Sequence, residues 1–250
     1  MTPPSNHPLI PESWGEGLPE VFYARLGDQI GRQRHMSADG HSLLVLHQPP
    51  EPDDELRAGR LFWRDAEGAW RSSHHGDGAQ ALTQHLEEYS QRIERVDLLE
   101  ERSSGVEAYF GVTERIAPLR RAVTHLHHVL QEAREAHAQD RELILLRDQA
   151  YALERRAELL AKNTESALNF EIARQAERQA QSSYQMALSA HRLNVLAAFF
   201  FPITAISSLL GVNYKEVIAG TFPPSLFMGA VAIGLCIGLV IMRLISPRNR

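Results

Sequence analysis

Hydrophobic positions divide the chain into a polar body and two apolar runs near its end. The body is charged throughout and reaches about Arg192. The first apolar run, Leu193–Leu210, has 18 residues, and the second, Ser225–Ser246, carries no charge before Arg243. At about 1.5 Å per residue, the second run is long enough for a helix that crosses a hydrocarbon core of about 30 Å. The first run is at the lower limit for such a helix, which could extend into Ala187–Ala190 without meeting a charge. We therefore expect two transmembrane helices.

Apolar residues with helical spacing run through the body from Ala79 onward. They recur at steps of three and four, which is typical of helices that pack together. They form three groups: Leu82, Leu86, Tyr89, Ile93, Val96; Ile116, Leu119, Val123, Leu126, Leu130; and Leu146, Ala150, Leu153, Ala157, Leu160, Thr164. Ser103–Gly105 separates the first two groups, and Ala136–Asp140 is a candidate turn. We expect Pro118 near the first turn of the second helix, because proline lacks a backbone N–H. The third helix meets no proline or glycine before Pro202.

The amino-terminal region has a mixed pattern that predicts a small α/β unit. Residues 1–20 hold five of the thirteen prolines and predict an irregular lead-in. Ser42–His47 predicts a buried strand, and Leu61–Arg64 and Ala69–Ser72 predict a hairpin around Asp65–Gly68. Such a unit is too small for a sizeable core of its own. We therefore expect it to pack against the helices that follow.

These patterns predict a mainly α membrane protein with a small amino-terminal α/β part, coiled-coil-like helices and a long stalk helix that continues into the first of two transmembrane helices. The expected order is an irregular lead-in (1–20), a small cytoplasmic α/β unit (21–77), cytoplasmic helices (78–140), the stalk and transmembrane helix 1 (141–210, with the span at about 193–210), an outer loop (211–224), transmembrane helix 2 (225–246) and a basic cytoplasmic tail (247–250).

Basic residues flank both apolar runs and predict the orientation. They are Arg174, Arg178 and Arg192 before the first run, and Arg243, Arg248 and Arg250 at the end of the second. By the positive-inside rule, we expect a multi-pass protein with both termini in the cytoplasm and the loop between the two runs outside. Residues 1–192 carry 30 of the 31 acidic and 22 of the 26 basic residues, a net charge of −8. Such a surface attracts cations in an oligomer, and it also simply aids solubility.

One face of the first apolar helix is small or polar apart from one aromatic residue. In helical spacing that face contains Asn194, Ala197, Phe201, Thr204 and Ser208. These residues are candidates for lining a hydrated path, with Phe201 as a constriction that gates by dewetting. Small and polar residues along a membrane helix also serve ordinary helix packing. The pattern by itself leaves both interpretations open.

A proline and a Gly-Val-Asn sequence mark the second half of that helix. Pro202 cannot donate to the carbonyl of Ala198, which frees that oxygen for water, an ion or a hydroxyl. Gly211 can end the helix, and Asn213 then places a carboxamide just outside the membrane. A ring of such oxygens suits hydrated Mg²⁺, which loses its water reluctantly. A simple helix cap and turn would use the same residues.

Phe201-Pro202-Ile203-Thr204, followed by Gly211-Val212-Asn213, resembles the corresponding motifs of the CorA metal-ion transporter superfamily, which carries Gly-Met-Asn where this chain has Gly-Val-Asn. The resemblance is specific over about 195–214 and general over 80–246. It implies a funnel-shaped homopentamer in the lipid bilayer, with span one of each subunit around a central pore. It also implies a selectivity ring at Gly211, Val212 and Asn213, with Thr204 as a pore-lining hydroxyl.

The function that this resemblance implies is transport of a divalent cation, Mg²⁺, Zn²⁺ or Co²⁺, through the pore. Two alternatives stay open. Val212 in place of Met, Lys215 in the outer loop and the short cytoplasmic domain favour one of them, a non-conducting membrane scaffold or sensor with the same fold. The other is proton-coupled zinc uptake like that of the ZntB branch, in which flux rises with an inward pH gradient.

Residues that could bind a regulatory cation are less well defined. Asp148, Glu154 and Glu158 are candidates by their position on the stalk, although an exposed charged face explains them equally well. His125 and His128 are neighbours on one helix face and would begin a zinc site, but a third ligand is not evident. We expect no covalently bound cofactor and no nucleic acid partner. No nucleotide-binding glycine loop, nucleophile elbow or HExxH motif occurs, so nothing supports an enzyme.

Overall fold

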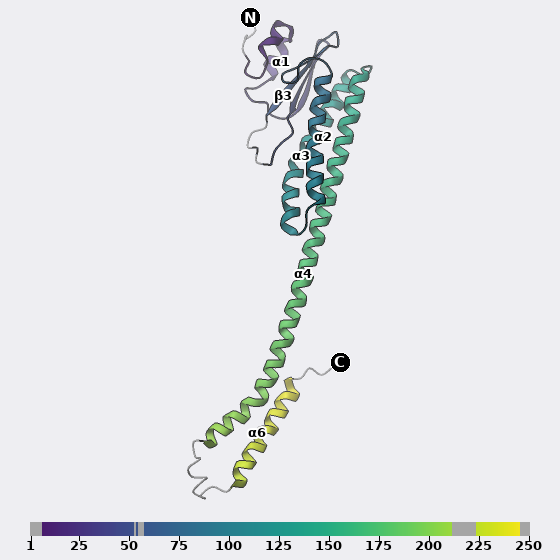
Figure 1. Cartoon of the computed structure of the whole chain (residues 1–250). Coiled ribbons are helices and arrows are strands. Elements are labelled where there is room, and N and C mark those ends of the chain that lie inside the picture. Colours follow the sequence, from purple (N-terminus) through teal and green to yellow (C-terminus); the bar gives the residue numbers. More distant parts are fainter. Residues whose placement is uncertain (1–6, 53, 55–57, 212–223, 246–250) are drawn as a thin grey trace. The chain divides into compact units, whose positions relative to one another are not determined.

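The computed structural model describes residues 7–52, 54, 58–211 and 224–245. The chain divides into two compact units, and the boundary lies within one long helix, between Ala173 and Arg174. We call residues 1–173 the amino-terminal unit and residues 174–250 the carboxy-terminal unit. Figure 1 labels the elements of both.

A four-stranded antiparallel sheet in sequential order forms the centre of the amino-terminal unit. Its strands are β1 (Arg34–Ala38), β2 (His41–His47), β3 (Gly59–Arg64) and β4 (Trp70–Ser72). The predicted buried strand is β2, and the predicted hairpin is β3–β4, in which Arg64 pairs with Trp70. Both predictions are confirmed. The β1–β2 turn holds Asp39 and Gly40 at φ of 50° and 80°, the Asp-Gly geometry of a tight hairpin.

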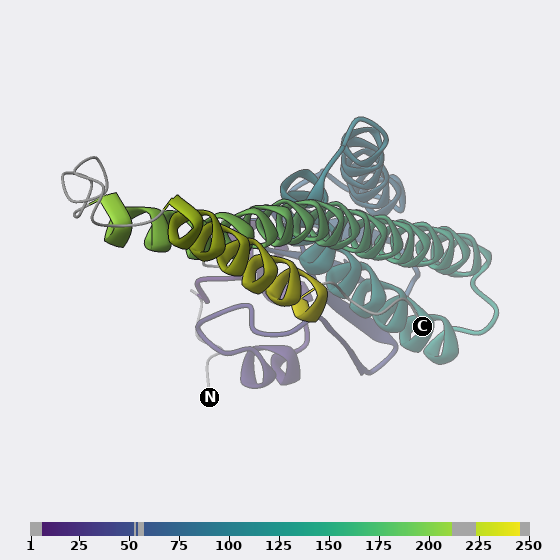
Figure 2. The same ribbon diagram turned by 90° about the horizontal axis from the view of Figure 1, so that it is seen from below.

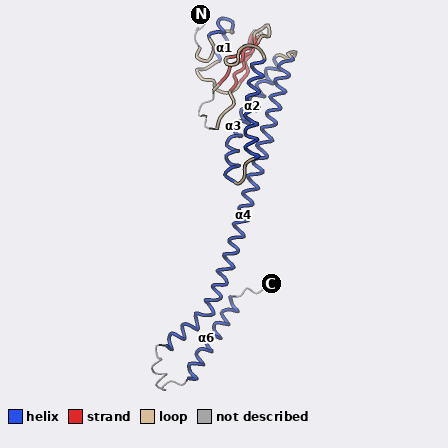
Figure 3. The backbone as a smooth tube through the Cα atoms, in the orientation of Figure 1, coloured by secondary structure: helices blue, strands red, loops and turns tan. Residues whose placement is uncertain are grey.

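Both faces of the sheet are covered (Figure 3). Alternate residues of β2 point to opposite sides, because side chains along a strand have a period of two. On one side, Leu44 and Leu46 pack with the helices that follow the sheet. On the other side, Leu43 and Val45 pack with a cluster from the amino-terminal segment: Ile10, Trp14, Leu18, Phe22 and Leu26.

The segment before the sheet contributes to this core. It contains the 3-10 helix η1 (Glu12–Gly17) and the short helix α1 (Glu20–Arg25). Trp14 is 3% exposed and its ring lies 5.7 Å from that of Trp63 on β3. The prolines that predicted an irregular lead-in precede these short turns, so the described part of the segment is folded onto the sheet.

Three helices follow the sheet: α2 (Gln80–Glu101), α3 (Val106–Ala136) and α4 (Arg141–Gly211). All sixteen residues of the three predicted apolar groups are buried, which confirms the helical packing. The break between α2 and α3 lies at Gly105, whose φ of 86° suits glycine. The turn between α3 and α4 lies at 137–140, as predicted.

The start of α4 is fixed to the sheet. Asp140 Oδ1 accepts hydrogen bonds from the backbone N–H groups of Glu142 and Leu143, at 3.0 and 3.3 Å, and so caps the helix. Its other carboxylate oxygen lies 3.0 Å from Arg64 of β3. The same carboxylate therefore begins α4 and joins it to the strand.

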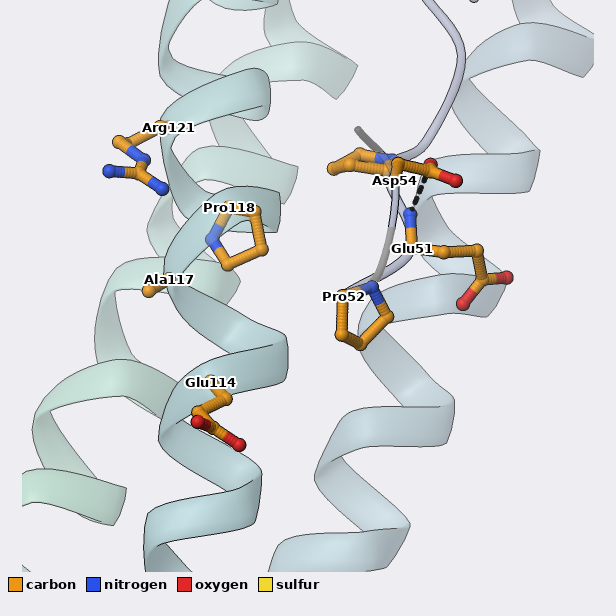
Figure 4. A pocket seen from close by; sticks show the side chains of 8 residues that line it. Glu51, Pro52, Asp54, Glu114, Ala117, Pro118 and Arg121 are labelled. Carbon is orange, nitrogen blue, oxygen red and sulfur yellow. Dashed lines mark hydrogen bonds between the residues drawn. The ribbon is translucent and has the colours of Figure 1, made fainter. Parts of the chain in front are cut away.

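The prediction that Pro118 lies near the first turn of its helix was wrong. Because α3 begins at Val106, Pro118 lies inside it. Figure 4 shows the Pro118 ring on the side of α3 that faces the segment of Glu51, Pro52 and Asp54, across a pocket of about 400 Å³. The apolar spacing begins earlier than the sequence analysis assumed, because Val112 is fully buried.

The carboxy-terminal unit contains the rest of α4 and the apolar helix α6 (Pro224–Ile245). Figures 1 and 2 both show α6 lying alongside this part of α4. Within the described residues, α4 is the one helix that is long and apolar enough to cross a membrane, judged by length and composition. In α6 the same criteria find a shorter apolar segment, Val231–Ile241.

Candidate functional site

The predicted path residues lie together on an uncovered face of α4. Asn194, Ala197, Phe201, Thr204 and Ser208 are all exposed within the chain, and Phe201 is 74% exposed. We call this set the open face of α4. Since the residues are spaced by three, four, three and four, they follow one side of the helix.

The opposite side of α4 packs against α6. Phe199, Ile203 and Ile206 are partly buried there, as expected for the side that faces the second apolar helix. By contrast, Leu196 is 54% exposed.

Two glycines of α6 allow this close packing. A methyl group placed on Gly238 would lie 3.0 Å from the carbonyl oxygen of Phe199, and one placed on Gly234 would lie 3.0 Å from Ile206 Cδ1. Gly234 and Gly238 are four residues apart, the spacing at which small residues let membrane helices approach closely. The sequence analysis missed this contact, although the Gly-xxx-Gly spacing inside an apolar run was a visible signal.

Pro202 and Thr204 shape the middle of the open face. Helix α4 continues through Pro202. The Thr204 hydroxyl donates to carbonyl oxygens of the preceding turn, those of Phe200 at 3.1 Å and Phe201 at 3.0 Å. A hydroxyl that donates to its own helix keeps its oxygen lone pairs as acceptors. Thr204 therefore presents an acceptor oxygen on a face that no described part of the chain covers.

The predicted selectivity residues are placed only in part. Gly211 is the last described residue of α4. Val212 and Asn213 lie outside the described residues, as does Lys215.

Two of the candidate regulatory residues have ionic neighbours close in sequence. Asp148 Oδ1 lies 3.3 Å from Arg147, and His128 Nε2 lies 3.4 Å from Glu132. Both pairs are on the surface, where such contacts contribute little to stability.

The two glutamates on α4 also have partners. Glu154 Oε2 lies 2.6 Å from His127 Nδ1 on α3. Glu158 accepts hydrogen bonds from Lys162 and Arg155, both at 2.9 Å, and these bonds hold the pKa of Glu158 below its usual value. A cation that bound at Glu158 would therefore compete with two fixed positive charges.

One surface pocket brings some of these candidates together. It has a volume of about 290 Å³, and its lining includes His125, Glu154 and Glu158. Arg120 and Arg121 line it as well. Their charges oppose a cation there, so the pocket shows proximity of the predicted ligands but not a favourable cation site.

Comparison with solved structures identifies the architecture. The structure of the full-length CmaX protein, a CorA-family protein, matches 92% of this chain and 84% of its own, with 16% sequence identity and a TM-score of 0.51. The chain has a CorA-type fold. The CorA magnesium transporter from Methanocaldococcus jannaschii matches 86% of this chain and 80% of its own, with 13% identity and a TM-score of 0.37, a likeness too low to carry weight. No family model and no curated protein matches the sequence.

Within this CorA-type fold, the described residues contain one compact group of metal-ligating side chains that the sequence analysis did not assemble. It consists of His75, His85 and Glu88, whose ligand atoms all lie within 4.8 Å of one another. His85 and Glu88 are i,i+3 neighbours on α2, a visible signal. His75 comes from the preceding loop, and only the fold brings it to them.

Proposed function

We propose that this protein transports divalent metal cations across the inner (plasma) membrane through a central pore formed by the α4 helices of a homopentamer. The observation that carries the proposal is the division of α4 into two sides. One side packs on α6, and the small and polar side, from Asn194 to Ser208, stays uncovered in a helix apolar enough to span a membrane. The CorA-type fold supports the same arrangement.

A polar face in an apolar helix must be covered by something other than lipid. Polar groups in a bilayer face other helices or water, because lipid cannot hydrogen-bond to them. Copies of α4 around an axis would place their open faces toward that axis. Rings of Thr204 and Ser208 oxygens would then surround a path for hydrated ions.

The proposed chemistry is contact with a hydrated ion. Mg²⁺ usually retains several waters, so neutral oxygens that accept hydrogen bonds from those waters can hold it without stripping them. Thr204 presents such an oxygen. We assign the same role, at the outer end, to the carboxamide of Asn213 on the basis of its sequence motif. Zn²⁺ and Co²⁺ remain alternative cargoes.

Phe201 favours a second candidate, a non-conducting scaffold or sensor with the same fold. Its ring is 74% exposed on the open face. A ring of such side chains around an axis would narrow the path and could expel water from it. In the transport proposal, the ring of Phe201 side chains is a gate that opens to let ions pass. In the scaffold proposal, the same ring stays closed.

Accessibility of introduced cysteines in liposomes tests the pore face. In a Cys236→Ala background, Thr204→Cys is compared with the matched control Ile203→Cys, which lies on the side packed against α6. A cationic methanethiosulfonate reagent reacts with thiolates in water far faster than with thiols in an apolar contact. We expect rapid modification of Thr204→Cys with loss of cation flux, and slow modification of Ile203→Cys.

Two results would contradict this assignment. One is equal modification rates at the two positions. The other is complete modification of Thr204→Cys without any change in flux, which would place the conducting path elsewhere or leave the protein non-conducting.

A further inference from the structure

A group of potential metal ligands lies in the amino-terminal unit. The cluster of His75, His85 and Glu88, defined above, joins the loop after β4 to helix α2. The side chain of His75 is 7% exposed, His85 is fully buried, and the side chain of Glu88 is 31% exposed. Two imidazoles and one carboxylate therefore meet at a site that is open to solvent on the Glu88 side.

Arg60 of β3 places a positive charge at the centre of this cluster. Its Nη1 atom lies 2.6 Å from Glu88 Oε2, 2.8 Å from His75 Nε2 and 3.1 Å from His85 Nδ1. Three ligand atoms from two elements thus converge on one cationic nitrogen. That nitrogen occupies the position that a bound metal ion would take.

The surroundings of both histidines of the cluster favour the neutral form of the ring. Burial, and then the charge of Arg60, lowers the pKa of His85 well below its usual value. Burial and Arg60 also lower the pKa of His75, against the opposing charge of Glu88. A neutral imidazole offers a nitrogen lone pair, whereas an imidazolium offers none.

The donor set selects a class of ion. Two imidazole nitrogens and one carboxylate oxygen, with a further position open to water, match the three-ligand sites of Zn²⁺. Mg²⁺ instead prefers oxygen ligands in an octahedron. Bonds to Zn²⁺ are about 2.0–2.2 Å long, so the ligand atoms would move inward by about 0.5–1 Å from their present distances to Arg60.

The surroundings provide a route for exchange. A pocket of about 240 Å³ is lined by both Arg60 and Glu88. It gives the Arg60 side chain a space beside the cluster and gives an ion access from solvent. Arg92, which also lines the pocket, is paired with Glu51.

We propose that His75, His85 and Glu88 bind Zn²⁺ reversibly, and that Arg60 is a tethered competitor that the ion displaces. The guanidinium and the ion cannot share the centre, because both are cations and both need the same lone pairs. Zn²⁺ binding therefore breaks the Arg60–Glu88 contact between β3 and α2. The site lies outside the proposed pore and does not depend on transport.

Zn²⁺ titration of the purified full-length protein, without a histidine tag, tests the site. Affinity is measured by competition with a chromophoric chelator, which separates one site from weak binding by surface histidines. We expect His75→Ala and Glu88→Gln each to weaken the tightest site by about tenfold or more, since even residues that only orient metal ligands have effects of that size. Glu87→Gln, one residue away and exposed, is the matched control and keeps the wild-type affinity.

Arg60→Met tests the competition. It removes the charge but retains much of the side-chain length, so we expect tighter Zn²⁺ binding. Co²⁺ added to this variant should give the visible absorption of a tetrahedral site, absent when His75→Ala is added. Tryptophan fluorescence checks that each variant is folded.

Two results would overturn the proposal. Equal Zn²⁺ affinities in Glu88→Gln and Glu87→Gln would overturn the site, and unchanged Zn²⁺ affinity in Arg60→Met would overturn the role of Arg60.

Discussion

Four histidines of the amino-terminal unit lie in surroundings that favour their neutral form. They are His35, His75, His85 and His137, and burial is the largest cause of the lowered pKa in each. His35 and His137 lie 3.0 and 2.7 Å from the Ser42 hydroxyl between them. Protonation of either ring would bring a charge next to the other, because the two share this serine.

These shifts predict loss of stability in acid. The folded-state pKa of each group lies below its unfolded value of 6.5. As the pH falls below 6.5, the unfolded chain therefore binds protons that the folded chain does not, and the free energy of unfolding decreases. Above pH 6.5 these histidines should leave the free energy of unfolding constant, because they are neutral in both states. Denaturant unfolding of the full chain in detergent, followed by tryptophan fluorescence, measures it, since Trp14, Trp63 and Trp70 all lie in this unit.

A pair of variants separates this effect from general acid sensitivity. His85→Asn should unfold more easily at neutral pH but lose less stability on acidification, because a group that titrates only on unfolding is removed. His128→Asn, at an exposed position, should retain the wild-type slope. A free energy of unfolding that is flat or rises between pH 7.5 and pH 5.5 would contradict the argument.

At the scale of elements, the contact between α4 and α6 depends on glycine. Gly238 lies against the backbone of Phe199, so Gly238→Leu would place a side chain where a methyl group already meets a carbonyl oxygen at 3.0 Å. Overpacking of this kind costs about 1–3 kcal/mol. We expect lower thermal stability and weaker cross-linking between α4 and α6 in membranes. Gly229→Leu is the matched control, since nothing lies within 4 Å there, and an equal loss in both variants would contradict the account.

The helices of the amino-terminal unit were predictable because their apolar spacing is regular. The residues from Leu82 to Thr164 that repeat at steps of three and four all proved buried. The position of Pro118 was not predictable by the same argument, since the helix begins ten residues before the first apolar group. Pro118 removes one backbone hydrogen bond of α3 without ending the helix.

One of the two candidate sites could be predicted from the sequence, and the other could not. The open face of α4 follows from helical geometry alone, so Asn194 and Thr204 were assigned to one side from their spacing. The cluster of His75, His85 and Glu88 could not be predicted. Strand pairing places Arg60 beside Glu88, a loop places His75 there, and sequence spacing describes neither. The hydrogen-bond partner of Glu154, His127 of α3, also became visible only in the fold, because it depends on how two helices pack.

At the scale of the whole molecule, the two units suggest two different uses of cations. The carboxy-terminal unit presents neutral oxygens on an uncovered helix face, which suits a hydrated ion in passage. The amino-terminal unit presents imidazoles and a carboxylate, which suit an ion bound directly. Residues 1–192 carry a net charge of −8, and a net negative charge attracts cations in general.

The central proposal is that cations pass along the α4 face and then Asn213. The most direct measurement is Mg²⁺ and Zn²⁺ uptake into liposomes that contain the wild-type protein, Asn213→Ala or the control Asn169→Ala, an exposed amide on α4 in the amino-terminal unit. The account predicts uptake above that of protein-free vesicles for wild type and Asn169→Ala, and loss of most of that uptake in Asn213→Ala. Uptake that is equal in all three proteins, or no higher than in empty vesicles, would contradict it.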